Sequence, residues 1–180
     1  MISSDIILCT ETQLVSNANI AEISIDGFKI TCNNDSEHRF SSLAAYYKNS
    51  VVLLEHFELN GFSVFEMSNN LISPLKIKIL LLYRKKDFPV EQFLETLRYL
   101  TVSMNIDIVV GDFNLKPNAM LDQALDNYEQ FVVEPTHLGG SILDHVYVQK
   151  SFLEHFNVFV NVKSLFFSDH EAIKICFKKK

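Results

Sequence analysis

The sequence is poor in glycine, proline and cysteine. Its 180 residues include only 5 Gly, 4 Pro and 3 Cys, whereas 48% of the residues are hydrophobic. Disordered and low-complexity chains have few hydrophobic residues, so this composition excludes them. Since domains average about 150 residues, we expect one domain over residues 1–180 with a well-filled core.

The few cysteines exclude a disulfide framework and a zinc site. Cys9, Cys32 and Cys176 lie in apolar segments, and none belongs to a Cys-x-x-Cys pair. Free cysteine packs as a small hydrophobic residue, so we expect all three side chains to be buried.

The chain also lacks the hydrophobic segments of membrane and secreted proteins. No apolar run approaches the roughly 20 residues that span a bilayer, and residues 1–5 lack the basic stretch of a signal peptide. We therefore expect no membrane association and an intracellular protein, in the cytoplasm or the nucleus.

Positive charge is in the minority. The chain has 16 Lys and Arg against 22 Asp and Glu, a net charge of −6. Domains that bind nucleic acid over a broad surface are normally basic, so this balance argues against such a surface. It leaves open a local site in which carboxylates surround a divalent cation. The basic clusters at residues 84–86 and 178–180 are interpreted as a solvated loop and a solubilising end.

Short apolar segments separated by polar clusters fill the first half. They predict strands at residues 5–10, 28–32, 42–47, 51–60, 62–67 and 75–83. In the last of these, Lys76 and Lys78 alternate with isoleucines before three leucines, so this strand should begin exposed and end buried. The pattern is typical of an antiparallel meander.

After Pro89 the spacing of the apolar residues becomes that of a helix. Apolar residues recur at steps of three and four after Pro89, which predicts a helix over residues 89–104. Further strands are predicted at residues 106–112, 128–134, 142–149, 156–162 and 171–177, with a short helix at 118–125. We expect an α/β (α+β) fold in which two mostly antiparallel sheets form a β-sandwich flanked by helices.

Three acidic stretches stand at the ends of, or inside, strand-like runs. They are Gly-Asp-Phe-Asn at 111–114, Leu-Asp-His at 143–145 and Ser-Asp-His at 168–170. Gly111 lets the backbone turn as a buried strand ends, so Asp112 and Asn114 should point from a strand edge. Such carboxylates are suited to hold a ligand, although Asp-x-Asn is also common in plain turns.

Five stretches taken in order resemble the endonuclease/exonuclease/phosphatase superfamily. They are Thr10-Glu11-Thr12, Tyr83-Arg84, Gly111-Asp112-Phe113-Asn114, Pro135-Thr136-His137-x-Gly139-Gly140-x-x-Leu143-Asp144 and Ser168-Asp169-His170. The resemblance covers nearly the whole chain. The Thr-His-x-x-Gly-x-x-Leu-Asp phrase and the Tyr-Arg after a strand are most similar to the endonuclease domains of non-LTR retrotransposons.

The resemblance implies a two-sheet sandwich and a phosphoesterase that depends on a divalent metal. The ion would be Mg²⁺, with Mn²⁺ as the alternative, held by Glu11 and Asp169, whose oxygen ligands suit a hard cation. A bound cation would also relieve the mutual repulsion of the clustered carboxylates. Taken alone, Glu11 could instead be an ordinary residue of a loop.

The resemblance also implies the catalytic residues. Asp112 would position or deprotonate the attacking water, and Asn114 would hydrogen-bond the phosphate. Asp144 would orient His170, whose imidazolium would stabilise the negative charge of the transition state. Tyr83 would lie beside the phosphate, although a tyrosine at a strand end with a wet hydroxyl is nearly as common.

Two other histidines have lesser roles in this interpretation. Thr136 and His137 are expected to shape the turn near the site. His145 alternates to the face of its strand opposite Asp144, so we assign it no catalytic role.

One part of the family pattern is missing. Family members begin with a strand that carries an asparagine, whereas only ten residues precede Glu11 here, and a strand already takes them up. We therefore expect an N-terminally truncated version of the fold, with reduced stability and activity. A monomer is expected, with association through the unpaired strand edge as the alternative.

These observations favour a metal-dependent phosphodiester hydrolase whose partner is nucleic acid, DNA in the first place, as in retrotransposon endonucleases. Two alternatives remain open. One is a catalytically silent remnant or binding module of the same fold, and the other is a phosphomonoesterase that acts on a small phosphorylated molecule.

Overall fold

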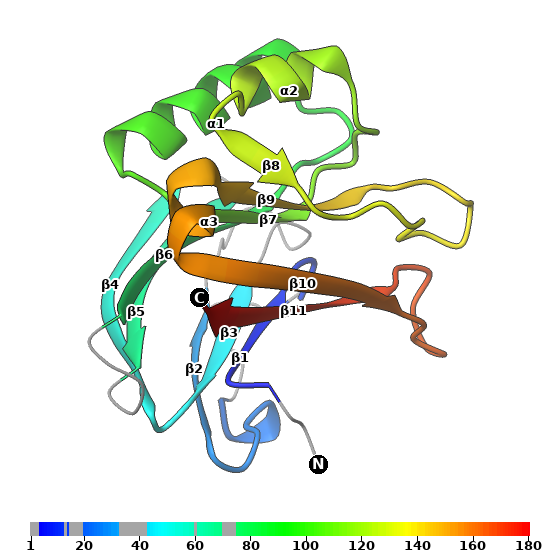
Figure 1. The fold of residues 1–180 in the computed structure, drawn as a ribbon. Coiled ribbons are helices and arrows are strands. Elements are labelled where there is room, and N and C mark those ends of the chain that lie inside the picture. Colours follow the sequence, from blue (N-terminus) through cyan, green and yellow to red (C-terminus); the bar gives the residue numbers. More distant parts are fainter. Residues whose placement is uncertain (1–3, 13, 15–19, 33–42, 60, 70–74) are drawn as a thin grey trace. The chain divides into compact units, whose positions relative to one another are not determined.

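The computed structural model describes residues 4–12, 14, 20–32, 43–59, 61–69 and 75–180 (Figure 1). The chain forms two compact units, Met1–Lys85 and Lys86–Lys180. The described residues are mainly β-strands, with three α-helices. The expectation of a single domain, and of two sheets packed face to face, stays a prediction.

The first unit contains a three-stranded antiparallel sheet. Its strands are β1 (Ile6–Cys9), β2 (Phe28–Cys32) and β3 (Ala44–Lys48), with β3 in the middle. A short 3₁₀-helix, Ile20–Glu22, lies between β1 and β2 along the chain. The strands predicted at residues 5–10, 28–32 and 42–47 are therefore confirmed, with ends that differ by one or two residues.

The first unit also contains the predicted meander. It consists of β4 (Val51–Leu59), β5 (Phe62–Asn69) and β6 (Leu75–Tyr83), paired antiparallel in that order. Along β6, Lys76 and Lys78 form ion pairs with Glu66 on β5, whereas the three leucines that follow are buried. The expected change from an exposed to a buried strand is thus confirmed.

Gly61 closes the turn between β4 and β5. Its φ is +79°, and a Cβ atom at this position would lie 2.6 Å from the carbonyl oxygen of Tyr83. Its own carbonyl accepts a hydrogen bond from the Tyr83 amide at 2.8 Å. Because only glycine tolerates both the left-handed backbone and this close approach, the end of β6 depends on Gly61.

The second unit begins with the predicted helix, α1 (Val90–Ser103), which follows Pro89. Its apolar stripe is buried, with Phe93, Leu97 and Leu100 almost fully covered. A second helix, α2 (Ala119–Ala124), starts where the side chain of Asn118 accepts hydrogen bonds from the first helical amides. Both helices lie on the same side of the neighbouring strands in Figure 1.

The strands of the second unit form an antiparallel set and a hairpin. The set consists of β7 (Ile108–Asp112), β9 (Asp144–Gln149) and β8 (Tyr128–Gln130), in that spatial order. The hairpin consists of β10 (Phe156–Lys163) and β11 (Ala172–Lys179). Among the described residues, no helix has the length and apolar character needed to cross a bilayer.

A third helix, α3 (Lys150–His155), was not predicted. Its six residues are too few to show a helical period, and its only buried residue is Phe152. That ring stacks on Phe156 at 4.6 Å and meets the edge of Phe177 at 5.6 Å. Tertiary packing at the base of the β10–β11 hairpin therefore specifies this helix.

Two other expectations were wrong in detail. The strand predicted at residues 128–134 ends at Gln130, where the side-chain oxygen of Gln130 accepts the amide hydrogen of Val132. Cys176 is exposed and the other two cysteines are half-buried, so the expectation that all three are buried fails. Cys176 lies in a two-stranded hairpin, of which many positions remain open to solvent.

The core of the second unit is centred on Phe113, which is fully buried. Its ring lies 5.7 Å from that of Phe93 on α1, 4.6 Å from that of His145 and 5.8 Å from that of Tyr147 on β9. This residue therefore joins the helix to the strands and holds the segment that directly follows Asp112.

We expect Phe113→Ala to lower the free energy of unfolding by about 3–5 kcal/mol, because it leaves a cavity among rings that cannot collapse into it. Urea denaturation followed by circular dichroism measures this change. Val102→Ala, at an exposed position on α1, should change the free energy by no more than about 0.5 kcal/mol. A similar small loss for Phe113→Ala would contradict the proposed centre of the core.

Candidate active site

The pairing of β7 with β9 places two aspartates opposite each other. Asp112 is the last residue of β7 and Asp144 the first of β9, and they are direct partners in the antiparallel register. The next amide, of Phe113, donates to the carbonyl of Leu143 at 2.9 Å. The strand ends are therefore held together just where the two carboxylates project.

Asp112 lies in a nearly closed environment, with 2% of its surface exposed. Its Oδ1 accepts the main-chain N–H of Asn114 at 2.8 Å, and its Oδ2 accepts the Asn114 side-chain amide at 3.1 Å. Asn114 has a φ of +45°, a left-handed conformation that asparagine tolerates better than most residues. The Asp-x-Asn stretch is thus a tight turn that also fixes the orientation of a buried carboxylate.

Gly111 precedes this turn with a φ of +145°. A residue with a Cβ atom rarely adopts this backbone, so the position needs glycine. The expectation that Gly111 lets the chain turn at the strand end agrees with this geometry.

Asp144 and His170 form a close ion pair. Nδ1 of His170 donates to Oδ2 of Asp144 at 2.8 Å, and both side chains are largely covered. The hydrogen bond that His170 donates to Asp144 raises the pKa of His170 to about 9 against the effect of burial, and the charges of Asp112 and Asp169 add to the rise. At neutral pH the ring is therefore an imidazolium, which carries a second N–H at Nε2.

Backbone hydrogen bonds join two loops beside this pair. His137 and His170 form an isolated antiparallel bridge, in which the amide of Glu171 donates to the carbonyl of Thr136 at 2.8 Å. The amide of Leu138 donates to the carbonyl of Asp169 at 2.9 Å. These bonds bring residues 168–170 to the start of β9.

Thr136 holds the start of β9 from within. Its side chain is fully buried, and its Oγ1 accepts the amide hydrogens of Leu143 and Asp144, both at 3.0 Å. The sequence indicated only a turn-shaping role for Thr136. Its contact with the backbone of Asp144 makes it a positioning residue, and no local pattern in the sequence reveals a contact across seven or eight residues.

His137 contacts Asp169, a partner that the sequence did not indicate. Nδ1 of His137 accepts the amide hydrogen of Gly139 at 2.9 Å, so the ring carries its hydrogen on Nε2, which lies 3.5 Å from Oδ2 of Asp169. The ring also meets that of His170 edge-on, with 5.1 Å between centroids. His137 thus links the turn to the exposed carboxylate of Asp169.

His145 lies on the other face of β9, as the alternation of side chains predicts. It is fully buried, where Nε2 donates to the carbonyl of Leu115 at 2.8 Å and Nδ1 lies 3.3 Å from the Gln130 amide. Burial lowers the pKa of His145. The ring is stacked on Tyr147, so its contacts are those of a neutral core residue.

The remaining predicted residues belong to the first unit. Glu11 is exposed two residues beyond β1, where it has a φ of +51°. Tyr83 ends β6 and is buried. Their roles in metal binding and beside the phosphate stay predictions, whereas the second unit itself brings together Asp112, Asn114, Asp144, Asp169 and His170.

Two groups of side chains in the described residues could surround a cation, with ligand atoms within 4.8 Å of one another. One group is Asp112, Asp144 and His170, and the other is His137, Asp169 and His170. Nδ1 of His170 already donates to Asp144, so this nitrogen has no lone pair for a metal. The carboxylates in each group fit a hard cation such as Mg²⁺, which prefers oxygen ligands.

This arrangement of strands belongs to a known class of fold. The chain has the endonuclease/exonuclease/phosphatase fold, as its likeness to several solved structures of that class shows. One of them is the endonuclease domain of TRAS1, a telomere-specific non-LTR retrotransposon, which has 18% sequence identity and a TM-score of 0.71. The match covers 97% of this chain and 84% of that domain.

Two other similar structures come from animals. The truncated TDP2 of Caenorhabditis elegans has 15% identity and a TM-score of 0.67, and covers 96% of this chain and 84% of its own. The catalytic domain of APE2 from Xenopus laevis has 12% identity and a TM-score of 0.61, over 99% and 84%. No protein-family model and no curated protein sequence matches this chain. At sequence identities this low, the structural likeness shows the shared fold alone.

We expect the NMR titration of the His170 ring to show a pKa of about 9, and Asp144→Asn to return it toward the ordinary value of 6.5. The difference between wild-type and His170→Gln spectra assigns the signal. Since the folded pKa lies above the unfolded one, the stability that the pair contributes is complete below pH 6.5 and is lost as pH rises through about 9. A His170 signal that titrates near 6.5 in the wild type would refute the ion pair.

Proposed function

We propose that this chain is a divalent-metal-dependent phosphodiester hydrolase that cleaves DNA. The observation that carries the proposal is the cluster of Asp112, Asp144 and His170, in which two carboxylates lie together and one of them, Asp144, holds the histidine ring. The likeness in fold to the TRAS1 endonuclease domain and the APE2 catalytic domain supports it. The retrotransposon-like phrases around Thr136 and Asp144 favour DNA over a small phosphate ester.

In this proposal Asp112 aligns the attacking water and takes its proton. A buried carboxylate with both oxygens held by Asn114 keeps one orientation, which lowers the entropic cost of reaching the transition state. Asn114 is proposed to donate to the phosphate. The roles of general base and phosphate donor therefore fall on two residues of one turn.

His170 stabilises the charge that develops on the phosphoryl oxygens. Its imidazolium is fixed through Nδ1 by Asp144, so Nε2–H can be directed at an oxygen of the phosphate without reorganisation. Thr136 keeps Asp144 in place through the backbone. Tyr83 is proposed to lie beside the same phosphate.

Glu11 and Asp169 are the proposed ligands of Mg²⁺, with Mn²⁺ as the alternative. The ion would polarise the phosphate and favour the deprotonated form of water. Glu11 has a left-handed backbone that costs a residue with a Cβ atom about 1–2 kcal/mol. Such outliers cluster at functional sites, which supports a ligand role for this residue.

The finer parts of the interpretation remain proposals of the same kind. They are a retrotransposon-like endonuclease activity, a single domain, a monomeric state and an intracellular location.

We expect the protein to nick supercoiled plasmid DNA with Mg²⁺ and to lose this activity in EDTA. Asp112→Asn and His170→Gln should each lower the rate by about 10²–10⁴-fold, because each removes a group that acts on the transition state. Gel electrophoresis of the plasmid forms measures the rate.

Asp126→Asn and His155→Gln are matched controls on exposed side chains of the second unit and should nick DNA at the wild-type rate. Nicking that persists in Asp112→Asn and His170→Gln would refute the assigned roles. If no DNA is cut, hydrolysis of nucleoside monophosphates or inositol phosphates would instead identify a phosphomonoesterase.

Calorimetry with Mg²⁺ tests the ligands separately from catalysis. We expect one ion to bind, and Asp169→Asn or Glu11→Gln to weaken binding by at least about tenfold, because each removes a charged oxygen ligand. Asp126→Asn should leave the affinity unchanged. Absence of Mg²⁺ binding to the wild-type protein would favour a catalytically silent module.

A further inference from the structure

Two phenylalanines in the second unit are open to water beside the proposed site. Phe166 and Phe167 are 101% and 87% exposed, and both lie in the loop between β10 and β11. Apolar rings in water are unfavourable, and exposed apolar groups that gather at one place mark interaction sites more often than single ones do. These two are adjacent in the chain, and the loop leads directly into Asp169 and His170.

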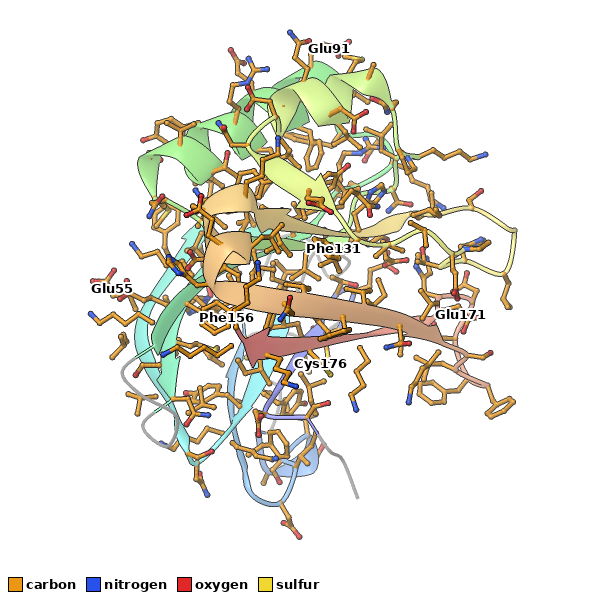
Figure 2. All side chains as sticks on the ribbon, in the orientation of Figure 1. Glu55, Glu91, Phe131, Phe156, Glu171 and Cys176 are labelled. Carbon is orange, nitrogen blue, oxygen red and sulfur yellow. The ribbon has the colours of Figure 1, made fainter. Side chains whose placement is uncertain are left out.

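The loop that carries the two rings is braced at both ends. Before them, Glu171 accepts the amide hydrogen of Leu165 at 3.0 Å and the hydroxyl hydrogen of Ser164 at 3.4 Å. After them, the hydroxyl of Ser168 accepts the amide hydrogen of His170 at 3.0 Å. Figure 2 shows Glu171 at the end of the β10–β11 hairpin where the loop connects the two strands. Side-chain hydrogen bonds therefore hold the segment on either side of the rings.

The distance between the two phenylalanine rings and His170 suits a nucleic acid strand. Residues span at most about 3.6 Å each, so the Cα atoms of Phe167 and His170 lie within about 11 Å. Nucleotides of one strand advance by about 3.4 Å each, so a strand held at His170 could place a base within about three steps at Phe167. Lys163, exposed at the end of β10, adds a positive charge to the same loop.

We propose that Phe166 and Phe167 form a stacking platform for unpaired nucleobases next to the cleaved phosphodiester. The proposal rests on the proposed function and narrows its substrate class to nucleic acid with single-stranded, gapped or unwound bases at the cut. In a duplex both faces of each base are covered by neighbouring pairs, whereas an unpaired base offers a face to an aromatic ring. The positive charge of Lys163 on the same loop suits the polyanionic backbone of such a strand.

The test measures affinity without hydrolysis. Wild type and Phe166→Ala/Phe167→Ala are titrated in EDTA into fluorescein-labelled DNA that is single-stranded, gapped or fully paired. We expect the double variant to bind the first two at least about tenfold more weakly, the loss typical of base–aromatic stacking, and to bind paired DNA as the wild type does. 2-Aminopurine placed in the gap should be quenched by the wild type alone.

Three further variants separate stacking from other effects. Phe166→Tyr/Phe167→Tyr should keep the affinity because its rings still stack, and Phe166→Leu/Phe167→Leu should lose it although its side chains stay apolar. Tyr99→Ala removes an exposed aromatic ring from α1 and should change nothing. Full binding by the leucine variant, or an equal loss on paired DNA, would overturn the stacking platform.

Sedimentation experiments test whether the wild type associates with itself. Self-association that the alanine variant loses, together with unchanged DNA binding, would also overturn the stacking platform and indicate a protein partner. Hydrolysis of methyl 4-nitrophenyl phosphate with Mg²⁺ tests the proposed function separately, since this diester has no nucleobase. If wild type and alanine variant hydrolyse this diester at equal rates and also bind DNA equally, the stacking platform is refuted and the proposed hydrolase function stands. If DNA binding depends on the two phenylalanines but the diester is not hydrolysed, the stacking platform stands and the proposed hydrolase function is refuted.

Discussion

The register between β7 and β9 is the constraint on which the candidate site depends. Because side chains alternate along a strand, Asp112 and Asp144 project at the same end only when these two residues are partners. The same register sends His145 to the opposite face, where it packs against Phe113 and Tyr147. A slip of β9 by one residue would turn Asp144 toward the face that packs against Phe113 and move His145 out of it, so the packing of that face and the geometry of the site depend on the same register.

The other half of the site is attached by main-chain hydrogen bonds. The bridge between His137 and His170 brings a distant loop to the start of β9, and Asp144 then binds the histidine through its ring. The raised pKa of His170 is a product of this assembly, since burial alone would lower it. Charge, orientation and position of the imidazolium thus all arise from contacts between segments more than twenty residues apart. The loop that ends in Asp169 and His170 also carries the exposed Phe166 and Phe167.

Much of the fold was predictable, and the misses have physical causes. Strands such as β4 to β6 and the helix α1 carry strong alternating or helical periods, and their predicted ranges agree closely with the structure. The helix α3 was missed because six residues around Phe152 show no period of their own. The strand β8 is shorter than predicted and ends at Gln130, whose side chain accepts the amide hydrogen of Val132. Local pattern therefore identifies long elements, whereas short ones depend on contacts made elsewhere.

The sequence by itself determined the order of the elements, the conformation of the Asp-x-Asn turn and the set of acidic and histidine residues, because these follow from local propensity and short motifs. Only the tertiary structure decided which of them meet. It showed Thr136 beneath Asp144, His137 against Asp169 and a protonated His170 between carboxylates. Such contacts depend on strand register and on the closure of long loops, which no nearest-neighbour pattern in the chain encodes.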